Sequence, residues 1–482
     1  MQRSHGTMLG TVRRTVLGMA VVLLVGAGFV GAGLCRAGED KPKAEKLSVT
    51  VRTDREDARY ALGETAAFVI TVRRSDEAVT EGSVRVTLRD DFSDTLREPP
   101  APLLETTLPL SADGARVTIA SEAPGFVTCR AAYVPETGQP VGGGLAAVAF
   151  APGEIEPAAA EPEDFDAFWA AAREERDAIP VDARVTPWTK WKAKGSRAWK
   201  LSLANIGGTR AWGYLTVPEG DGPFPLVVQV PGANLRAPSA PMARHDAVGA
   251  MQLIVSVHAH DPNMPKAELD RHLKEDLWNY IRLGAPDREA CYWKRAVLGV
   301  DRMIEYVASE YPWDGKHCVM VGGSQGGAFA LLMAGFNRQV TACAADKPAL
   351  CDHAGYTVGR GTGWPNLASW QEPAIQDATL RMSGYFDTIF FARRVRVPAV
   401  VGVGFIDGTC PPSGVYAAYN GIPGPKRIFD QPRVGHGFGK HNFDAFVKTW
   451  LPGQLGRTDP APPTAAPDAA TQADSTTTAE RR

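Results

Sequence analysis

Cysteine is scarce in this 482-residue sequence, and neither sign of charge is in excess. The cysteines include no close pair, which excludes the spacing of a zinc knuckle or a redox motif. A formal net charge of −2 argues against a nucleic-acid polymer as partner. With 44% apolar and 22% charged residues, the composition is that of an ordinary soluble globular protein. The seven cysteines are Cys35, Cys129, Cys291, Cys318, Cys343, Cys351 and Cys410.

The N-terminal segment has the layout of a secretory signal. Basic residues precede an uncharged apolar run over residues 15–34, and Cys35-Arg36-Ala37 follows. This pattern predicts a signal peptide over residues 1–37 that is cleaved after Ala37. The alternative is an uncleaved membrane anchor, because a run of this length can span a bilayer. Either one predicts an exported protein, periplasmic or secreted, whose other cysteines are buried as small apolar residues or form one or two disulfides.

Residues 38–153 have the pattern of an all-β domain. Short segments rich in β-branched residues alternate with turns such as Asp113-Gly114 and Pro124-Gly125. This spacing predicts a small β-sandwich that resembles an immunoglobulin-like module. No reactive group of residues stands out in it, so we expect a spacer or a support, with carbohydrate binding as the alternative. The predicted strands cover residues 47–51, 68–72, 84–88, 117–119, 126–134 and 145–150.

A Pro/Ala/Glu-rich linker, Glu154 to Pro162, leads into a segment whose hydrophobic period alternates between helix and strand. Its strands are apolar throughout, which predicts an α/β domain over residues 154–455 with a mostly parallel sheet covered on both faces. Residues 456–482 are rich in Pro, Ala, Thr and Asp and are predicted to be disordered. Helices are predicted over residues 164–178 and before Cys318, and strands over residues 226–230, 253–257, 318–321, 399–406 and 427–429.

One glycine-rich segment stands where a predicted strand turns into a helix. Val319-Met320-Val321 runs into Gly322-Gly323-Ser324-Gln325-Gly326-Gly327, and an apolar helix follows. This is G-x-S-x-G in the context of a nucleophile elbow, a strained turn that lifts the serine hydroxyl clear of the sheet. The look-alike at residues 359–363 has no strand leading into it. Ser324 is therefore the predicted nucleophile, with a glycine-rich turn or a phosphate cradle as the alternative.

The partners that a serine nucleophile needs follow in the chain order of α/β-hydrolases. Asp407 and then His436 each come just after a predicted strand. An imidazole must take the serine proton, and a carboxylate must orient the imidazole and stabilise its charged form. We therefore predict a triad of Ser324, Asp407 and His436. The rival residues are Asp430 for the acid and His441 for the base.

The reaction also needs backbone N–H donors for an oxyanion. One comes from the residue after the nucleophile, here Gln325, at the start of a helix where negative charge is favoured. The second comes from the loop after an earlier strand, which reads Pro231-Gly232-Ala233-Asn234. Because Pro231 has no N–H to give, Ala233 is the predicted second donor.

Together these residues resemble the acetyl xylan esterase / cephalosporin-C deacetylase family of α/β-hydrolases over residues 161–451. The resemblance implies an α/β-hydrolase fold and a serine esterase that removes acetyl groups from esterified sugars without a cofactor. It assigns the family's nucleophile, acid and base to Ser324, Asp407 and His436, and the second oxyanion N–H to Ala233. The motifs that carry it are Asp164-Phe165-Asp166-Ala167-Phe168-Trp169, Gly213-Tyr214-Leu215-Thr216-Val217-Pro218, Gly322 to Gly327, Asp407-Gly408-Thr409-Cys410-Pro411-Pro412-Ser413 and Ala417-Ala418-Tyr419-Asn420.

Three positions depart from the family's pattern. The family has a tyrosine where Ala233 stands and a glutamate where Gly437 stands. It also has an Arg-Gly-Gln-Gly run where this chain has His258-Ala259-His260-Asp261. Two histidines at positions i and i+2 of a strand point the same way and could hold a metal, but no third ligand is evident. We therefore expect this loop to line the cleft, with no metal bound.

Two rival functions share the triad and the fold. A serine peptidase of the prolyl-oligopeptidase kind would need a β-propeller, for which the β segment is too short. An exported binding protein would keep the fold without catalysis, which the intact triad argues against.

The expected partner of the chain is a small acylated sugar or oligosaccharide. A membrane is involved only if residues 1–37 stay uncleaved, and oligomerisation is left open. If the β domain is a spacer, a chain that begins near Glu161 should fold and hydrolyse small esters.

Overall fold

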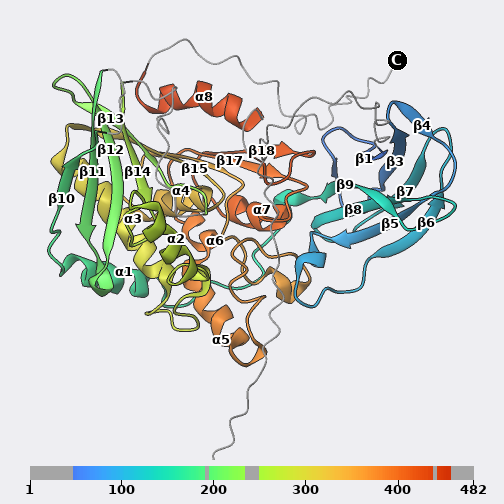
Figure 1. Ribbon diagram of the computed structural model, residues 1–482, viewed down its shortest axis with the longest axis horizontal. Coiled ribbons are helices and arrows are strands. Elements are labelled where there is room, and N and C mark those ends of the chain that lie inside the picture. The colour runs from blue at the N-terminus through green and yellow to red at the C-terminus, as the bar shows by residue number, and fades with distance from the viewer. Residues whose placement is uncertain (1–46, 190–194, 234–248, 438–441, 458–482) are drawn as a thin grey trace, which may run out of the picture. The chain divides into compact units, whose positions relative to one another are not determined.

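The computed structural model describes residues 47–189, 195–233, 249–437 and 442–457 (Figure 1). The predicted signal peptide, the predicted tail from residue 458 onward and His441 lie outside these ranges. Within them, no helix combines the length and the apolar composition needed to cross a membrane. The described residues all belong to one compact unit.

The N-terminal strands form two sheets around one core. The first sheet contains β1, β3, β4 and β7, and the second has the order β2-β9-β8-β5-β6. Alternate residues of a strand point inward, so Val84, Val86 and Leu88 of β5 are buried while Arg85 is exposed. Sequence patterning missed β6, an edge strand that buries no residue fully. The bounds are β1 Leu47–Thr53, β2 Arg59–Tyr60, β3 Ala66–Arg74, β4 Glu77–Val79, β5 Ser83–Asp90, β6 Leu104–Pro109, β7 Ala115–Ile119, β8 Gly125–Val134 and β9 Val141–Phe150.

The remaining strands form one mixed sheet with the order β10-β11-β12-β14-β13-β15-β16-β17-β18. The pairs from β14 to β18 are parallel, and the pairs among β10, β11, β12 and β14 are antiparallel. The carboxyl ends of the parallel strands therefore meet at one edge, where ligand sites of α/β folds collect. The bounds are β10 Arg184–Pro187, β11 Ser196–Ala204, β12 Arg210–Pro218, β13 Phe224–Gln229, β14 Met251–Ser256, β15 Trp313–Gly323, β16 Ala342–Asp346, β17 Ala399–Gly404 and β18 Lys426–Gln431.

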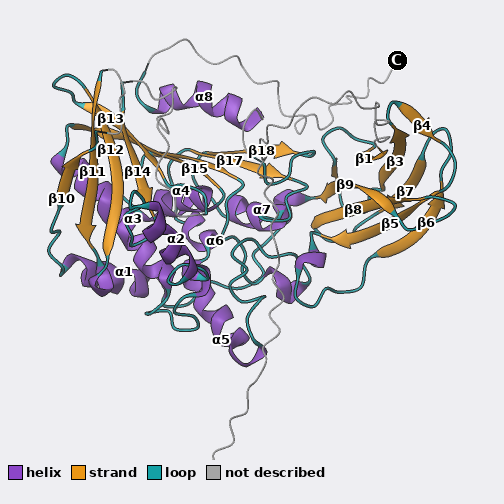
Figure 2. Ribbon diagram, viewed as in Figure 1, coloured by secondary structure: helices purple, strands orange, loops and turns teal. Residues whose placement is uncertain are grey.

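Helices cover both faces of this sheet (Figure 2). On one face α8 packs Phe443, Val447 and Leu451 against the strands. On the other face lie α1, α3, α4, α6 and α7, whose apolar residues share one cluster with the strands. The predicted stripe of α3, Val297, Val300, Ile304 and Val307, is buried there. The bounds are α1 Phe165–Asp177, α2 Lys266–Lys274, α3 Tyr292–Glu310, α4 Gln325–Phe336, α5 Pro373–Ser383, α6 Thr388–Ala392, α7 Pro412–Asn420 and α8 Asn442–Gln454.

The β segment shares core with the α/β segment. Phe126 of β8 packs edge-on against Phe405 with ring centroids 5.0 Å apart, and its ring lies 5.7 Å from Tyr416. Ala147 and Ala149 of β9 belong to the same apolar cluster. Of the two expected roles, these contacts favour a support over a spacer, because removing the β segment would expose aromatic side chains that it now covers.

A second contact lies on the loop after β5. The backbone N–H of Ser413 donates to Asp91 Oδ2 at 3.1 Å, and that of Gly361 donates to the Asp91 carbonyl at 2.8 Å. Phe92, which has a left-handed φ of 55°, is buried, and a Cβ built on Gly408 would lie 3.0 Å from its ring. The loop thus covers the segment that begins at Asp407.

We predict that Phe126→Ala lowers the free energy of unfolding by about 3–5 kcal/mol, because the side chain is only 2% exposed and its loss leaves a cavity. Urea unfolding of the full chain measures this. Leu103→Ala, at a side chain that is 46% exposed, is the matched control and should change stability by less than about 0.5 kcal/mol.

A chain that begins near Glu161 should be less stable than the full chain. Equal stability of the two chains would favour a spacer role for the β segment.

Candidate active site

The turn between β15 and α4 holds Ser324 in a strained conformation. Its φ of 56° and ψ of −124° are values that residues with a side chain rarely adopt. The neighbouring glycines allow the turn: a Cβ on Gly326 would lie 2.0 Å from the Val230 carbonyl oxygen, and one on Gly322 would lie 2.3 Å from the backbone of Gly326. The turn therefore needs residues without a Cβ at these two positions.

The structure brings the three residues of the predicted triad into contact. Ser324 Oγ lies 3.0 Å from His436 Nε2, and His436 Nδ1 lies 2.8 Å from Asp407 Oδ2. Asp407 is fully buried and Ser324 is 8% exposed, while the His436 side chain is half-buried. These are hydrogen-bond distances, and the order hydroxyl, imidazole, carboxylate is the one that nucleophilic catalysis by serine requires.

Backbone donors hold the Asp407 carboxylate in place. Its Oδ1 accepts the N–H groups of Thr409 and Cys410, each at 2.9 Å. With Oδ1 engaged in this way, Oδ2 faces His436. The rival acid Asp430 has other contacts: its Oδ2 lies 2.7 Å from Arg59 Nη1, and its Oδ1 accepts the Tyr416 hydroxyl at 2.5 Å.

Gln325 carries one of the two predicted oxyanion donors, and its side chain bonds to the loop that carries the other. Its backbone N–H stands at the first position of α4, where the N–H has no partner within the helix. Its side-chain Nε2 donates to the Pro231 carbonyl at 3.2 Å, which ties the start of α4 to the loop that carries Ala233. Its Oε1 accepts the Tyr280 hydroxyl at 3.1 Å. Ala233 is half-buried and is the last described residue before the gap at 234–248.

A group of aromatic side chains continues from Gln325. Tyr280 lies 4.7 Å from the His258 ring and 6.3 Å from the Trp364 ring, and Trp364 packs edge-on against Trp293 at 5.9 Å. His258 is buried with its Nδ1 2.6 Å from the Tyr292 hydroxyl, and burial lowers its pKa to about 3. His258 is therefore a neutral member of this group. We call the group, which consists of His258, Tyr280, Tyr292, Trp293 and Trp364, the aromatic wall. The sequence offered no period or spacing that joins these positions.

A buried ion pair lies beneath the elbow, and sequence reasoning missed it. Lys347 Nζ lies 2.6 Å from Asp346 Oδ2, and the lysine is fully buried. The Asp346 carbonyl accepts the Ser324 N–H at 3.0 Å, so the pair is attached to the backbone of Ser324, the predicted nucleophile. Two adjacent charged residues directly after the apolar run 342–345 are the sequence signal that could have found this pair.

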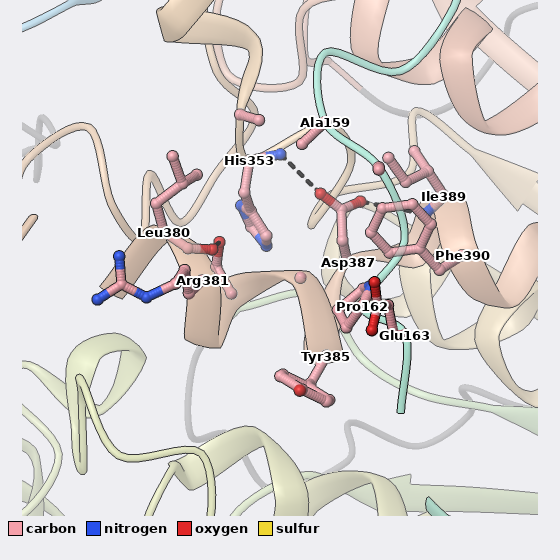
Figure 3. Close-up of a pocket in the computed structure, with 14 residues that line it drawn as sticks. Ala159, Pro162, Glu163, His353, Leu380, Arg381, Tyr385, Asp387, Ile389 and Phe390 are labelled. Atoms are coloured by element: carbon pink, nitrogen blue, oxygen red, sulfur yellow. Dashed lines mark hydrogen bonds between the residues drawn. The ribbon is translucent and has the colours of Figure 1, made fainter. Parts of the chain in front are cut away.

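A separate cavity of about 460 Å³ lies between α5, α6 and the linker (Figure 3). Its lining includes Pro162, Leu380 and Phe390, and no member of the triad. Asp387 shapes one wall by accepting the backbone N–H groups of Asp352 and His353 at 3.0 and 2.7 Å. Burial raises the pKa of Asp387 to about 7. These bonds hold the loop after β16 in place, which is a structural role.

The chain matches the model of the acetyl xylan esterase (AXE1) family over residues 153–451. The chain belongs to the acetyl xylan esterase family. Membership in this family places the chain among the carboxylic ester hydrolases. The match begins just after β9, so the N-terminal strands lie outside it.

Individual relatives agree with the family match. The acetyl esterase Axe7A of Xylanibacter ruminicola is 33% identical over 297 residues, which cover 60% of this chain and 66% of that relative, slightly under two thirds of its length. The acetyl xylan esterase from Paenibacillus sp. R4 has a TM-score of 0.53 at 22% identity and covers 62% of this chain and 96% of its own. Acetyl xylan esterase 1 from Thermoanaerobacterium sp. JW/SL YS485 has a TM-score of 0.53 at 19% identity, covering 63% and 97%. The likeness to these two solved structures shows that this chain has the α/β-hydrolase fold.

We predict that Lys347→Met lowers the free energy of unfolding by about 3–5 kcal/mol, since it leaves the buried Asp346 carboxylate without the cation beside it. Urea unfolding measures the change. The control is Lys266→Met, which breaks the exposed Lys266–Asp270 pair and should cost less than about 1 kcal/mol. Equal small losses in the two variants would contradict a stabilising role for the buried pair.

Proposed function

We propose that this chain is a serine esterase that removes acetyl groups from esterified sugars or oligosaccharides through an acyl-enzyme. The observation that carries the proposal is the chain of contacts from Ser324 Oγ to His436 Nε2 and from His436 Nδ1 to Asp407, at 3.0 and 2.8 Å. Membership in the acetyl xylan esterase family and the likeness to an acetyl esterase support the choice of substrate.

In the first half of the reaction, Ser324 Oγ attacks the carbonyl carbon of the ester while its proton passes to His436 Nε2. The carbonyl oxygen becomes an oxyanion, for which the N–H groups of Gln325 and Ala233 are the proposed donors. When the bond to the sugar oxygen breaks, that oxygen takes the proton from Nε2 and the sugar leaves as an alcohol. Asp407 orients the ring and stabilises its charged form.

In the second half, a water molecule replaces the sugar. His436 Nε2 takes a proton from this water as it attacks the acetyl carbonyl, and returns the proton to Ser324 Oγ when the acyl bond breaks. Acetate leaves and the serine is restored. Every proton is carried by the imidazole, so the reaction needs no cofactor.

The other parts of the chain have proposed roles. Residues 1–37 would direct export as a cleaved signal, and residues 38–153 would form an immunoglobulin-like module that supports the catalytic domain at 154–455. The contacts of Phe126 and Phe92 with the catalytic segment are the evidence for a module that holds the catalytic domain in place. A membrane is a partner only if the N-terminal segment is retained.

We predict that Ser324→Ala lowers the hydrolysis of p-nitrophenyl acetate by at least roughly a thousandfold, because the covalent step is lost. The rate of p-nitrophenol release measures this, with circular dichroism to show that the fold is kept. Ser309→Ala, at an exposed position of α3, is the control and should have wild-type activity. Near-wild-type turnover by a folded Ser324→Ala variant would overturn the triad.

Substrate comparison separates the rival functions. The wild-type chain should release acetate from acetylated xylan and hydrolyse p-nitrophenyl acetate far faster than a peptide p-nitroanilide. Faster cleavage of the anilide would favour a peptidase, and retention of xylan without any hydrolysis would favour a binding protein.

Ala233 should broaden the acyl preference. It keeps a backbone N–H, but the family's ring is missing, which leaves room beside the scissile ester unless Trp364 or His258 fills it. We predict that propionyl and butyryl p-nitrophenyl esters are cleaved at rates comparable to acetyl, and that Ala233→Tyr restores a preference for acetyl. One methylene in an apolar pocket changes discrimination by about 1–3 kcal/mol, so ratios of kcat/KM resolve the effect.

Ala233→Gly is the matched control, since it keeps the N–H and adds no ring, and it should stay as broad as the wild type. Strong acetyl selectivity in the wild type would mean that another side chain occupies the space, and this interpretation of Ala233 would be wrong.

A further inference from the structure

The histidine-rich loop after β14 does not have the arrangement that its sequence suggests. His258 turns into the aromatic wall beside Tyr280 and Tyr292. His260 contacts α2, where its ring centroid lies 4.0 Å from that of His272. The chain has left the strand at Ser256, so the two histidines no longer share a face. His258 is therefore not available to a ligand that His260 binds.

Three potential metal ligands meet at this point. His272 lies in α2 and Asp276 follows four residues later, a spacing that places both on one side of the helix end. The ligand atoms of His260, His272 and Asp276 all lie within 4.8 Å of one another. Asp276 Oδ2 is 3.6 Å from His260 Nε2 and 2.5 Å from His272 Nδ1. The third ligand that the sequence did not reveal thus comes from a different element.

These distances suit a tetrahedral ion after a small movement. Nitrogen and oxygen ligands lie about 2.0–2.2 Å from Zn²⁺ and hence roughly 3.3 Å from one another. The separation between His260 and Asp276 is already close to this value. The contact between His272 and Asp276 is a hydrogen bond that must open by roughly 0.8 Å, as the ion takes the place of the bonded proton. Asp276 is exposed, which gives an ion and its water a path to the site.

The chemistry of the three groups also fits a cation. Two imidazole nitrogens and a carboxylate oxygen are donors that Zn²⁺ accepts in proteins. The Asp276 carboxylate places a negative charge 3.6 Å from His260 Nε2 and beside His272 Nδ1.

Arg271 works against the site. Its Nη2 lies 3.0 Å from His272 Nε2, and its Nη1 pairs with Glu275 Oε2 at 3.1 Å. In the metal-free form Nε2 accepts from Arg271 and Nδ1–H donates to Asp276. When an ion binds Nδ1, the ring proton moves to Nε2 and Arg271 keeps only its partner Glu275. The guanidinium also repels a cation, so the affinity should be moderate.

We propose that His260, His272 and Asp276 form a Zn²⁺ site, completed by water, that joins the loop after β14 to α2. Two imidazoles and one carboxylate are a ligand set that suits zinc better than magnesium or calcium. The site goes beyond the proposed esterase activity, since it shares no residue with the triad. Bound Zn²⁺ would tie down both ends of the segment 260–276, which precedes Tyr280 and its hydrogen bond to Gln325.

Isothermal titration of the chelator-treated full chain with ZnCl₂ tests the proposal, with MgCl₂ as the second titrant. We expect one equivalent of Zn²⁺ to bind with micromolar affinity and Mg²⁺ not to bind. His260→Gln and Asp276→Asn should each weaken Zn²⁺ binding by at least about tenfold, as losing a ligand costs no less than losing a group that supports one. Arg271→Gln should tighten it, an effect that a purely structural role of the cluster would not produce.

His317→Gln is the matched control, because His317 also pairs with an aspartate, Asp314, at 2.7 Å, but has no second histidine in that pair. It should bind Zn²⁺ like the wild type. Thermal unfolding without metal checks that each variant is folded. Because Asp276 is exposed, Asp276→Asn is the variant that should disturb the fold least.

Two results would overturn the site. One is the absence of Zn²⁺ binding by the wild type. The other is wild-type binding by His260→Gln together with loss of binding by His436→Gln, which would place the ion on Asp407, Cys410 and His436. Since binding is measured without substrate, neither result depends on esterase activity, and a failure of the esterase assay would leave the metal site standing.

Discussion

The close approach of α4 to the ends of β13 and β15 is the constraint on which the proposed active site depends. At Gly326 the helix lies so near the Val230 carbonyl that a methyl group there would be 2.0 Å from the oxygen. Ser324 has a positive φ in this packing, and β16 and the loop after it hold that residue. Its N–H donates to the Asp346 carbonyl at 3.0 Å, and its carbonyl accepts the Ala349 N–H at 3.1 Å. The position of the hydroxyl is thus set by the sheet, because the strain is held by contacts on several strands.

The position of Asp407, the proposed acid, depends on a more distant part of the chain. Two N–H groups of its own loop orient Asp407. Phe92 covers that loop at Gly408, and the Ser413 N–H that follows it donates to Asp91. Asp91 and Phe92 both lie in the loop after β5. Asp91 is buried, and burial raises its pKa to about 7. A segment outside the family match therefore supplies part of the support for a site inside it.

The two histidines of the loop after β14 have different surroundings. One belongs to the aromatic wall that leads to Gln325, and the other faces α2. The rule that residues i and i+2 share a face applies only while the backbone is a strand, and β14 ends at Ser256. This is a physical reason why the spacing of the two histidines alone does not predict a shared ligand.

Local pattern was enough to predict the alternation of apolar strands and helices, the strand–turn–helix context of Ser324 and the order in which Asp407 and His436 follow. These features depend on residues close together in the chain, whose periodicity and turn chemistry the sequence displays directly. It missed the antiparallel strands β10, β11 and β12 of the mixed sheet. It also missed β16, whose alanines have little strand preference, and β6, which lies at an edge. The Asp346–Lys347 pair, the cover of Phe92 over Gly408 and the meeting of His260 with His272 and Asp276 were decided only by the tertiary structure. Each of them depends on which distant surfaces pack together, and burial, which makes a charge costly or a ring stabilising, exists only once the chain has folded.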